Sequence, residues 1–132
     1  RIMTANNKTE TKVIQISYFQ QKDKNSFTSN NTFLAGYTTN VYDVKDNFGY
    51  HVVNNSQIKL PDHIISKLDE IKEKAILLHN QLQSKLLSWD IVFDCENYYF
   101  LEGNTLSLIS PKTDRNLNIK IKNYINFMFS DF

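Results

Sequence analysis

The sequence predicts an α+β domain, in which two main helices pack on an antiparallel β-sheet. Runs rich in β-branched and aromatic residues, at 11–20 and 32–44, alternate with polar and turn-forming segments, a pattern typical of antiparallel strands. From Pro61 onward, apolar residues recur instead every three or four positions, which is the spacing of one face of an α-helix. At 132 residues the chain suits one domain, residues 1–132, with a core of its own.

Composition and charge exclude several classes of protein. Hydrophobic residues make up 41% of the chain and charged residues 22%, which is typical of a folded globular domain. The formal net charge of +1 favours neither nonspecific nucleic-acid binding nor a polybasic membrane contact. No apolar run reaches the roughly 18 residues of a membrane span, and the single cysteine, Cys95, favours a reducing compartment. We therefore expect a cytoplasmic protein with no nucleic-acid partner and no membrane span.

The strands of the first half are expected to form a meander. The expected strands cover residues 1–4, 11–20, 32–44 and 50–54. The third strand has an irregular start around Gly36, and a turn signal at 45–49 precedes the fourth. Because the first strand begins at Arg1 rather than at a methionine, we expect the chain to be part of a longer protein.

Two amphipathic helices are expected to cover this sheet. The first runs from about residue 61 to about residue 85, because Pro61 suits a first helical turn and Asp62 suits the positive helix end. The second follows a polar loop around 111–114. The residues expected on the apolar faces are Ile64, Leu68, Ile71, Ala75, Leu78 and Leu82 in the first helix, and Leu117, Ile121, Tyr124, Ile125 and Met128 in the second.

Between the helices, residues 88–104 carry two apolar runs around a polar turn, which predicts a β-hairpin. We expect residues 95–97 to form the turn. Since side chains alternate between the faces of a strand, this turn places Asp90 directly opposite Glu102, with Cβ atoms about 5 Å apart. The same face of the second strand would carry Tyr98, Phe100, Glu102 and Asn104.

Two carboxylates that face each other need compensation, because like charges in opposite positions destabilise a sheet. The pair can share a proton, can be solvated by water, or can hold a cation. A cation also accounts for Asn104, since Mg²⁺ takes oxygen ligands and leaves positions open for phosphate. Alternatively, Asp90 ends a strand at the surface and residues 102–104 are a turn. Spacing alone leaves these possibilities open.

The segment WDIVFDCENYYFLEGN, residues 89–104, resembles the metal-binding hairpin of the ATP-grasp superfamily. In that hairpin an acid on one strand is followed on the next strand by the motif E-x-N. Asp90, Glu102 and Asn104 fall on these positions. The chain most resembles the C-terminal lobe of the sugar-transfer-associated ATP-grasp proteins, which are related to α-L-glutamate ligases.

The resemblance extends with uneven strength along the chain. Residues 69–94 resemble the helix and strand of that family, including its late helical histidine, His79 here. We expect His79 to be a hydrogen-bonding or surface residue and Trp89 to be a core anchor. Arg1 resembles a phosphate-contacting arginine at a strand start. The match is weakest at Asn31 and Gly36, which correspond to an asparagine-plus-glycine loop; Ala35 and Asn30 depart from that loop pattern.

The resemblance implies a ligase that uses ATP and Mg²⁺ (or Mn²⁺) to activate a carboxylate as an acyl phosphate, which an amine or a related nucleophile then attacks. Asp90, Glu102 and Asn104 would bind the metal against the nucleotide phosphates. Leu101 would lie beside the adenine, although a core position is the other role open to it. Arg1 would contact the transferring phosphate. The substrates would be ATP and a small carboxylate or sugar-linked compound, in polysaccharide biosynthesis at the cell surface.

An ATP-grasp enzyme also needs an earlier lobe, with a lysine-bearing strand and a glycine-rich loop over the nucleotide. The sequence contains neither. With Arg1 aligned, this N-terminal lobe of the same protein would precede residue 1, so the isolated chain is expected to be inactive. The alternative function is that of an α+β interaction module or a degenerate lobe. Such a module would show an exposed apolar patch, and its acids would point apart.

Overall fold

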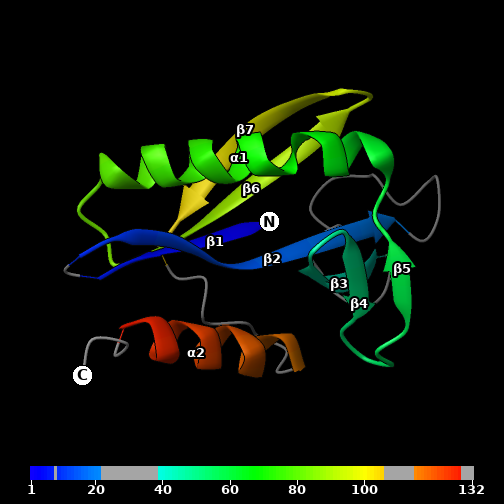
Figure 1. The fold of residues 1–132 in the computed structure, drawn as a ribbon, viewed down its shortest axis with the longest axis horizontal. Coiled ribbons are helices and arrows are strands. Elements are labelled where there is room, and N and C mark those ends of the chain that lie inside the picture. Colours follow the sequence, from blue (N-terminus) through cyan, green and yellow to red (C-terminus); the bar gives the residue numbers. More distant parts are fainter. Residues whose placement is uncertain (8, 22–38, 106–114, 129–132) are drawn as a thin grey trace.

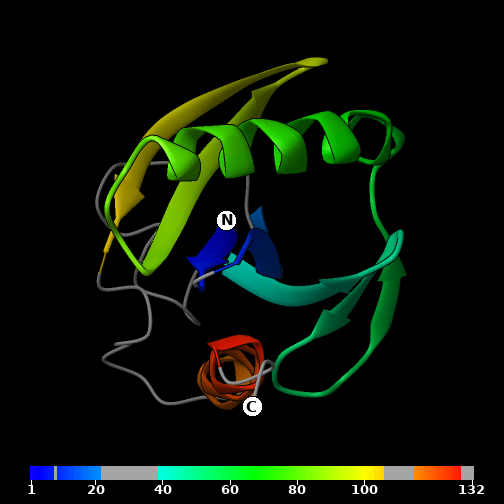
Figure 2. The ribbon, with the colours of Figure 1, turned by 60° about the vertical axis from the view of Figure 1, so that its left-hand side comes forward.

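The computed structural model describes residues 1–7, 9–21, 39–105 and 115–128. In this part of the chain, seven antiparallel strands form one sheet with the order β5-β4-β3-β2-β1-β6-β7 (Figure 1). Helices α1 and α2 lie on opposite faces of this sheet (Figure 2). The predicted α+β class is therefore confirmed. The elements are β1 (Ile2–Asn6), β2 (Thr11–Gln21), β3 (Thr39–Lys45), β4 (Phe48–His51), β5 (Gln57–Lys59), α1 (Asp62–Asn80), β6 (Leu86–Asp94), β7 (Asn97–Asn104) and α2 (Arg115–Met128).

The meander of the first half differs from the prediction at its ends. The described part of β3 begins at Thr39, so its expected irregular start lies outside the described residues. Strand β4 begins earlier than predicted, because the turn before it is completed by Asp46 at a φ of 56°. The sequence does not predict β5, since three residues are too few to show a period. Within the described ranges, neither helix has the length and hydrophobicity that a membrane crossing requires.

Helix α1 packs on the central strands through the larger of two apolar clusters. Ile71 and Ala75 of α1 contact Ile2 of β1 and Leu87 and Trp89 of β6. On the opposite face, Phe127 of α2 closes a second cluster around Met3, Ala5 and Leu86. Alternate residues of β1 and β6 therefore enter different cores, as the two-residue period of a strand requires.

Helix α2 is present where it was predicted, and Tyr124 and Met128 pack against the second cluster as expected. Ile125 does not, because 48% of its surface is exposed, and Phe127 occupies the central inward position instead. The predicted set was therefore wrong at Ile125. The side chains of Leu117 and Ile121 lie outside the described residues.

Helix α1 ends at Asn80, five residues before the predicted end at 85. Leu78 and Leu82 were wrongly placed in the apolar stripe, since they are 37% and 52% exposed. Leu82 lies beyond the end of the helix, and Leu78 lies within it but beside the buried position. The inward position of the last turn belongs to His79, which is fully buried. A helix that finishes with a histidine on its buried face needs polar partners there, because an unpaired buried polar group is costly.

His79 finds these partners in a buried hydrogen-bond network. Its Nδ1 atom lies 2.7 Å from Thr4 Oγ1, and its Nε2 atom lies 2.8 Å from the carbonyl oxygen of Ser84. Trp89 Nε1 donates to the same Thr4 hydroxyl oxygen, at 2.9 Å. The hydroxyl of Thr4 thus joins α1, β1 and β6 in the centre of the domain.

The network fixes one hydrogen-bond donor of His79. A carbonyl oxygen only accepts, so His79 Nε2 donates to Ser84. The indole N–H of Trp89 only donates, so the Thr4 oxygen accepts from it. The same hydroxyl is the hydrogen-bond partner of His79 Nδ1.

Replacement of Thr4 by Val should destabilise the domain strongly. The variant keeps the shape of the side chain but leaves the Trp89 N–H and the His79 Nδ1 without a partner, at a cost of roughly 2–4 kcal/mol in free energy of unfolding. Urea denaturation monitored by Trp89 fluorescence measures this cost. Thr4→Ser is the matched control, because it retains the hydroxyl; equal losses in both variants would contradict the importance of the network.

Candidate functional site

The hairpin of β6 and β7 turns on two residues, Cys95 and Glu96, and not on the three predicted. Cys95 adopts a φ of 55°, which a tight two-residue hairpin turn requires. Pairing therefore begins one position earlier than expected, with Asp94 opposite Asn97. The register then shifts between Asp90 and Ile91, where Leu101 is inserted as a β-bulge. The predicted pairing of Asp90 with Glu102 is restored by this extra residue and is confirmed.

The bulge also changes which side chains share a face, so the prediction for β7 was wrong. Tyr98 and Phe100 pack with the cluster under α1. Glu102 and Asn104, predicted on the same face as these two, lie on the other face with Asp90. Gly103 confirms the change, because a Cβ atom there would lie 2.7 Å from Trp89 Cζ3, on the α1 side of the sheet.

Arg1 and Asp90 form an ion pair at the start of β1. The Arg1 Nε atom donates to Asp90 Oδ1 at 2.8 Å. The guanidinium also lies over the ring of Phe19, 5.3 Å from its centroid. Asp90 is buried, whereas Arg1 is partly exposed. A buried carboxylate that is paired and hydrogen-bonded in this way retains its charge at lower cost.

Glu102 and Asn104 are exposed neighbours on β7. The Asn104 amide nitrogen donates to Glu102 Oε1 at 3.1 Å. In the sheet Glu102 lies opposite Asp90, and Asn104 lies opposite Ser88. Ser88 is buried, and its hydroxyl has no hydrogen-bond partner among the described residues. The residues predicted to bind metal therefore share one face of the hairpin, and an orphaned hydroxyl lies beside them.

These residues belong to a polar row that crosses the sheet on the face away from α1. The row runs from Glu102 through Asp90 and Arg1 to Ser17, whose backbone exchanges two 2.9 Å hydrogen bonds with that of Arg1. It ends at Asp43 of β3, which lies opposite Ser17. Three carboxylates and one guanidinium thus lie on one line across neighbouring strands.

Asp43 is the member of this row that the sequence analysis missed. It is buried, and Gln15 Nε2 donates to its Oδ1 at 3.2 Å. Burial raises the pKa of Asp43, and the hydrogen bond from Gln15 acts in the opposite direction. The available signal was an acid between Tyr42 and Val44, within an otherwise apolar strand.

The donor set suits a hard divalent cation. Asp90 and Glu102 offer carboxylate oxygens, and Asn104 offers an amide oxygen once its side chain is turned. Two carboxylates and one amide match the few protein ligands that Mg²⁺ takes when phosphate supplies the others. Among the described residues no group of three His, Cys, Asp or Glu side chains is arranged to hold a metal. The hairpin therefore offers two carboxylates and one amide, and the other ligands of a cation would come from phosphate or water.

Leu101 does not occupy a core position, since 60% of its surface is exposed. It lines the rim of a cavity of about 610 Å³ together with Arg1 and Asp90. Glu102 and Asn104 lie outside this lining. Asn31 and Gly36, which correspond to the family loop, lie outside the described residues. Arg1, Asp90 and Leu101 are thus brought together at the cavity, next to the exposed pair on β7.

No family model, no curated protein and no solved structure matches this chain. The functional argument therefore depends on the geometry of the site.

Asp43→Asn should change the pH dependence of stability. Because burial raises the pKa of Asp43 in the folded state, the wild type loses stability as pH rises through that pKa. The variant has no carboxyl group at this position and does not lose stability in this way. The free energy of unfolding of the variant minus that of the wild type should therefore be larger at about pH 7 than at about pH 4. Urea denaturation at both pH values, with the exposed Asp69→Asn as control, measures the effect; the same difference at both pH values would contradict it.

Proposed function

We propose that this chain is the metal- and phosphate-binding lobe of an ATP-dependent ligase of the ATP-grasp type, which activates a carboxylate as an acyl phosphate. The observation that carries the proposal is the pairing of Asp90 with Glu102 in adjacent strands, with Asn104 on the same face and Arg1 bound to Asp90. In the alternative interaction module the acids are expected to point apart, whereas Asp90 and Glu102 share one face of the sheet.

In this proposal Asp90, Glu102 and Asn104 hold Mg²⁺ or Mn²⁺. When bound, the metal supplies positive charge that offsets the charge of the nucleotide phosphates. The protein contributes rigidity, because Asp90 follows Trp89 directly on a strand that the Thr4 network fixes. Glu102 and Asn104 are held by the bulge and by the close packing of Gly103 under Trp89. Because the backbone at these positions is held, only side chains have to adjust on binding.

Arg1 orients anionic groups beside the metal position. Its planar guanidinium suits phosphate and carboxylate oxygens, and its position is fixed by Asp90 and Phe19. The remaining parts of the proposal, a preceding nucleotide lobe and a role in cell-surface polysaccharide biosynthesis, rest on the family resemblance alone. Cytoplasmic location is part of the same proposal.

Glu102→Ala should weaken binding of Mn²⁺–ADP roughly ten-fold or more, since it removes one of two carboxylate ligands. Calorimetry measures the affinity, and paramagnetic broadening by Mn²⁺ should be strongest at the amides near Glu102. Glu96→Ala is the control, because it makes the same charge change at the hairpin turn. Equal affinities of wild type and Glu102→Ala would contradict the proposal.

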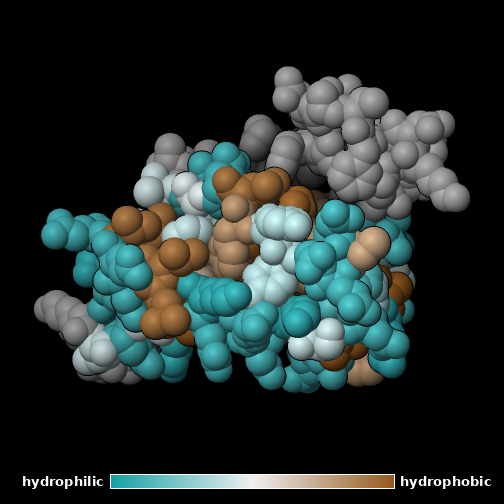
Figure 3. Space-filling view, turned by 90° about the horizontal axis from the view of Figure 1, so that it is seen from above, coloured by the Kyte–Doolittle hydropathy of each residue, from teal (hydrophilic) through white to brown (hydrophobic). Residues whose placement is uncertain are grey.

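A second candidate function is self-association, and the exposed leucines at the carboxyl-terminal end of α1 favour it. Leu77 and Leu82 are 62% and 52% exposed, and Leu78 lies between them. In Figure 3 hydrophobic surface gathers over this end of the helix. Contiguous apolar surface of this kind marks contact sites between proteins.

If this surface joins two copies of the chain, the double variant Leu77→Lys/Leu82→Lys should be monomeric at concentrations where the wild type is dimeric. Analytical ultracentrifugation distinguishes the two states. Lys72→Glu, a charge change on the same helix, is the control. A wild type that stays monomeric at all concentrations would exclude this function.

A further inference from the structure

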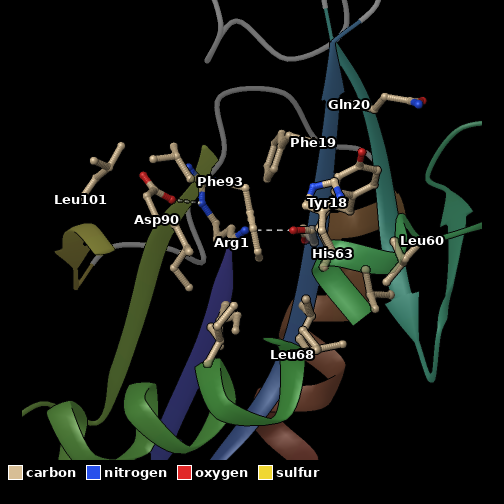
Figure 4. Close-up of a pocket in the computed structure, with 18 residues that line it drawn as sticks. Arg1, Tyr18, Phe19, Gln20, Leu60, His63, Leu68, Asp90, Phe93 and Leu101 are labelled. Atoms are coloured by element: carbon tan, nitrogen blue, oxygen red, sulfur yellow. Dashed lines mark hydrogen bonds and ion pairs between the residues drawn. The ribbon is translucent and has the colours of Figure 1, made fainter. Parts of the chain in front are cut away.

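The cavity of about 610 Å³ lies where β1 begins, between the strands on either side of it. Ile2 of β1 lies opposite Ile16 and Trp89, and the last backbone hydrogen bonds at this end join Arg1 to Ser17 of β2. Beyond this point β2 and β6 continue on both sides of a gap, and α1 closes the gap from below (Figure 4). The cavity therefore passes from the underside of α1 to the face that carries the polar row.

The walls of this cavity are mainly apolar. Leu68 and Ile71 of α1, Phe93 of β6 and Tyr18 of β2 are among the residues that line it. A cavity of this size is within the range of ligand pockets. Its apolar walls suit an aliphatic or aromatic group.

The charged side chains of the cavity are confined to the Arg1–Asp90 pair (Figure 4). His63, Gln20 and Tyr18 are the polar groups at the opposite wall, and the lining includes no lysine and no other acid among the described residues. A ligand whose apolar part lies over Leu68 meets Arg1 where the cavity opens toward the polar row. The guanidinium matches a carboxylate in shape and charge.

We propose that this cavity binds the apolar body of a carboxylic acid and that Arg1 receives its carboxylate. The inference rests on the proposed function, which it deepens by naming the class of the acid that is activated: an amphipathic carboxylate with an aliphatic or aromatic body. Its carboxylate would lie next to Asp90, and therefore beside the proposed position of metal and phosphate. A polar sugar would leave the apolar walls uncovered.

Three probes with the same aliphatic chain and different head groups test the ligand class: octanoate, octanol and octylamine. Titration with and without Mg²⁺, followed by NMR, gives their affinities and the signals that move. Octanoate should bind roughly ten-fold or more tightly than octanol, as expected for a charge-assisted contact, and should shift the methyl signals of Leu68 and Ile71. Equal affinity for octanoate and octanol, or preference for octylamine, would overturn the assignment.

Two variants locate the site. Leu68→Trp fills the cavity and should abolish octanoate binding, whereas Glu73→Trp adds a tryptophan on the exposed side of α1 and should not alter it. Arg1→Met should reduce octanoate affinity to that of octanol. If Leu68→Trp fails to fold, Ile64→Trp fills the same cavity from a partly exposed position. Octanoate binding that survives a folded cavity-filling variant would overturn the inference.

The two proposals fail separately. Glu102→Ala should leave octanoate binding unchanged, because Glu102 is outside the cavity lining. Mn²⁺–ADP binding is measured separately on the wild type and on Glu102→Ala, because Glu102 and Asn104 lie outside the cavity lining. Intact metal–nucleotide binding without octanoate selectivity would reject the substrate class alone. Octanoate selectivity without Mn²⁺–ADP binding would reject the ligase function while leaving a carboxylate-binding cavity.

Discussion

The hydroxyl of Thr4 is the point on which the arrangement of the domain depends. It accepts from Trp89 on β6 and meets His79 at the last turn of α1, so one atom fixes a helix and two strands relative to one another. Buried polar networks of this kind specify a single packing, because every alternative leaves a polar atom unpaired. The network also positions the site, because Asp90 directly follows Trp89 and Arg1 directly precedes the strand that carries Thr4.

The bulge at Leu101 places the two ends of β7 in different roles, one in the core and one in the candidate site. Before the bulge, Tyr98 and Phe100 complete the core under α1; after it, Glu102 turns to the face that carries Asp90. A regular strand would have placed all three on one side. The glycine that follows Glu102 is then required by close approach, since a Cβ atom at Gly103 would meet the indole ring.

The α+β class and most elements could be predicted from the sequence, because period-two and period-3.6 patterns record which side of each element is buried. The pairing of Asp90 with Glu102 was also predicted, although from a three-residue turn; the structure reaches the same pairing with a two-residue turn and a bulge. Two features were not. The end of α1 depends on a polar network around His79, which carries no hydrophobic signal. The polar row depends on register across β1, β2 and β3. Asp43 joins the row only because Ser17 lies between it and Arg1.

The central position of β1 has a consequence for the order in which the domain folds. Strands β2 to β5 pair with their neighbours in the chain, and β6 pairs with β7 through a two-residue turn. These contacts are local and form quickly. In contrast, Ile2 pairs with Trp89 across most of the sequence, and loop closure must precede that contact. We therefore expect docking of β1 against β6, which also creates the Arg1–Asp90 pair, to be a late step in folding.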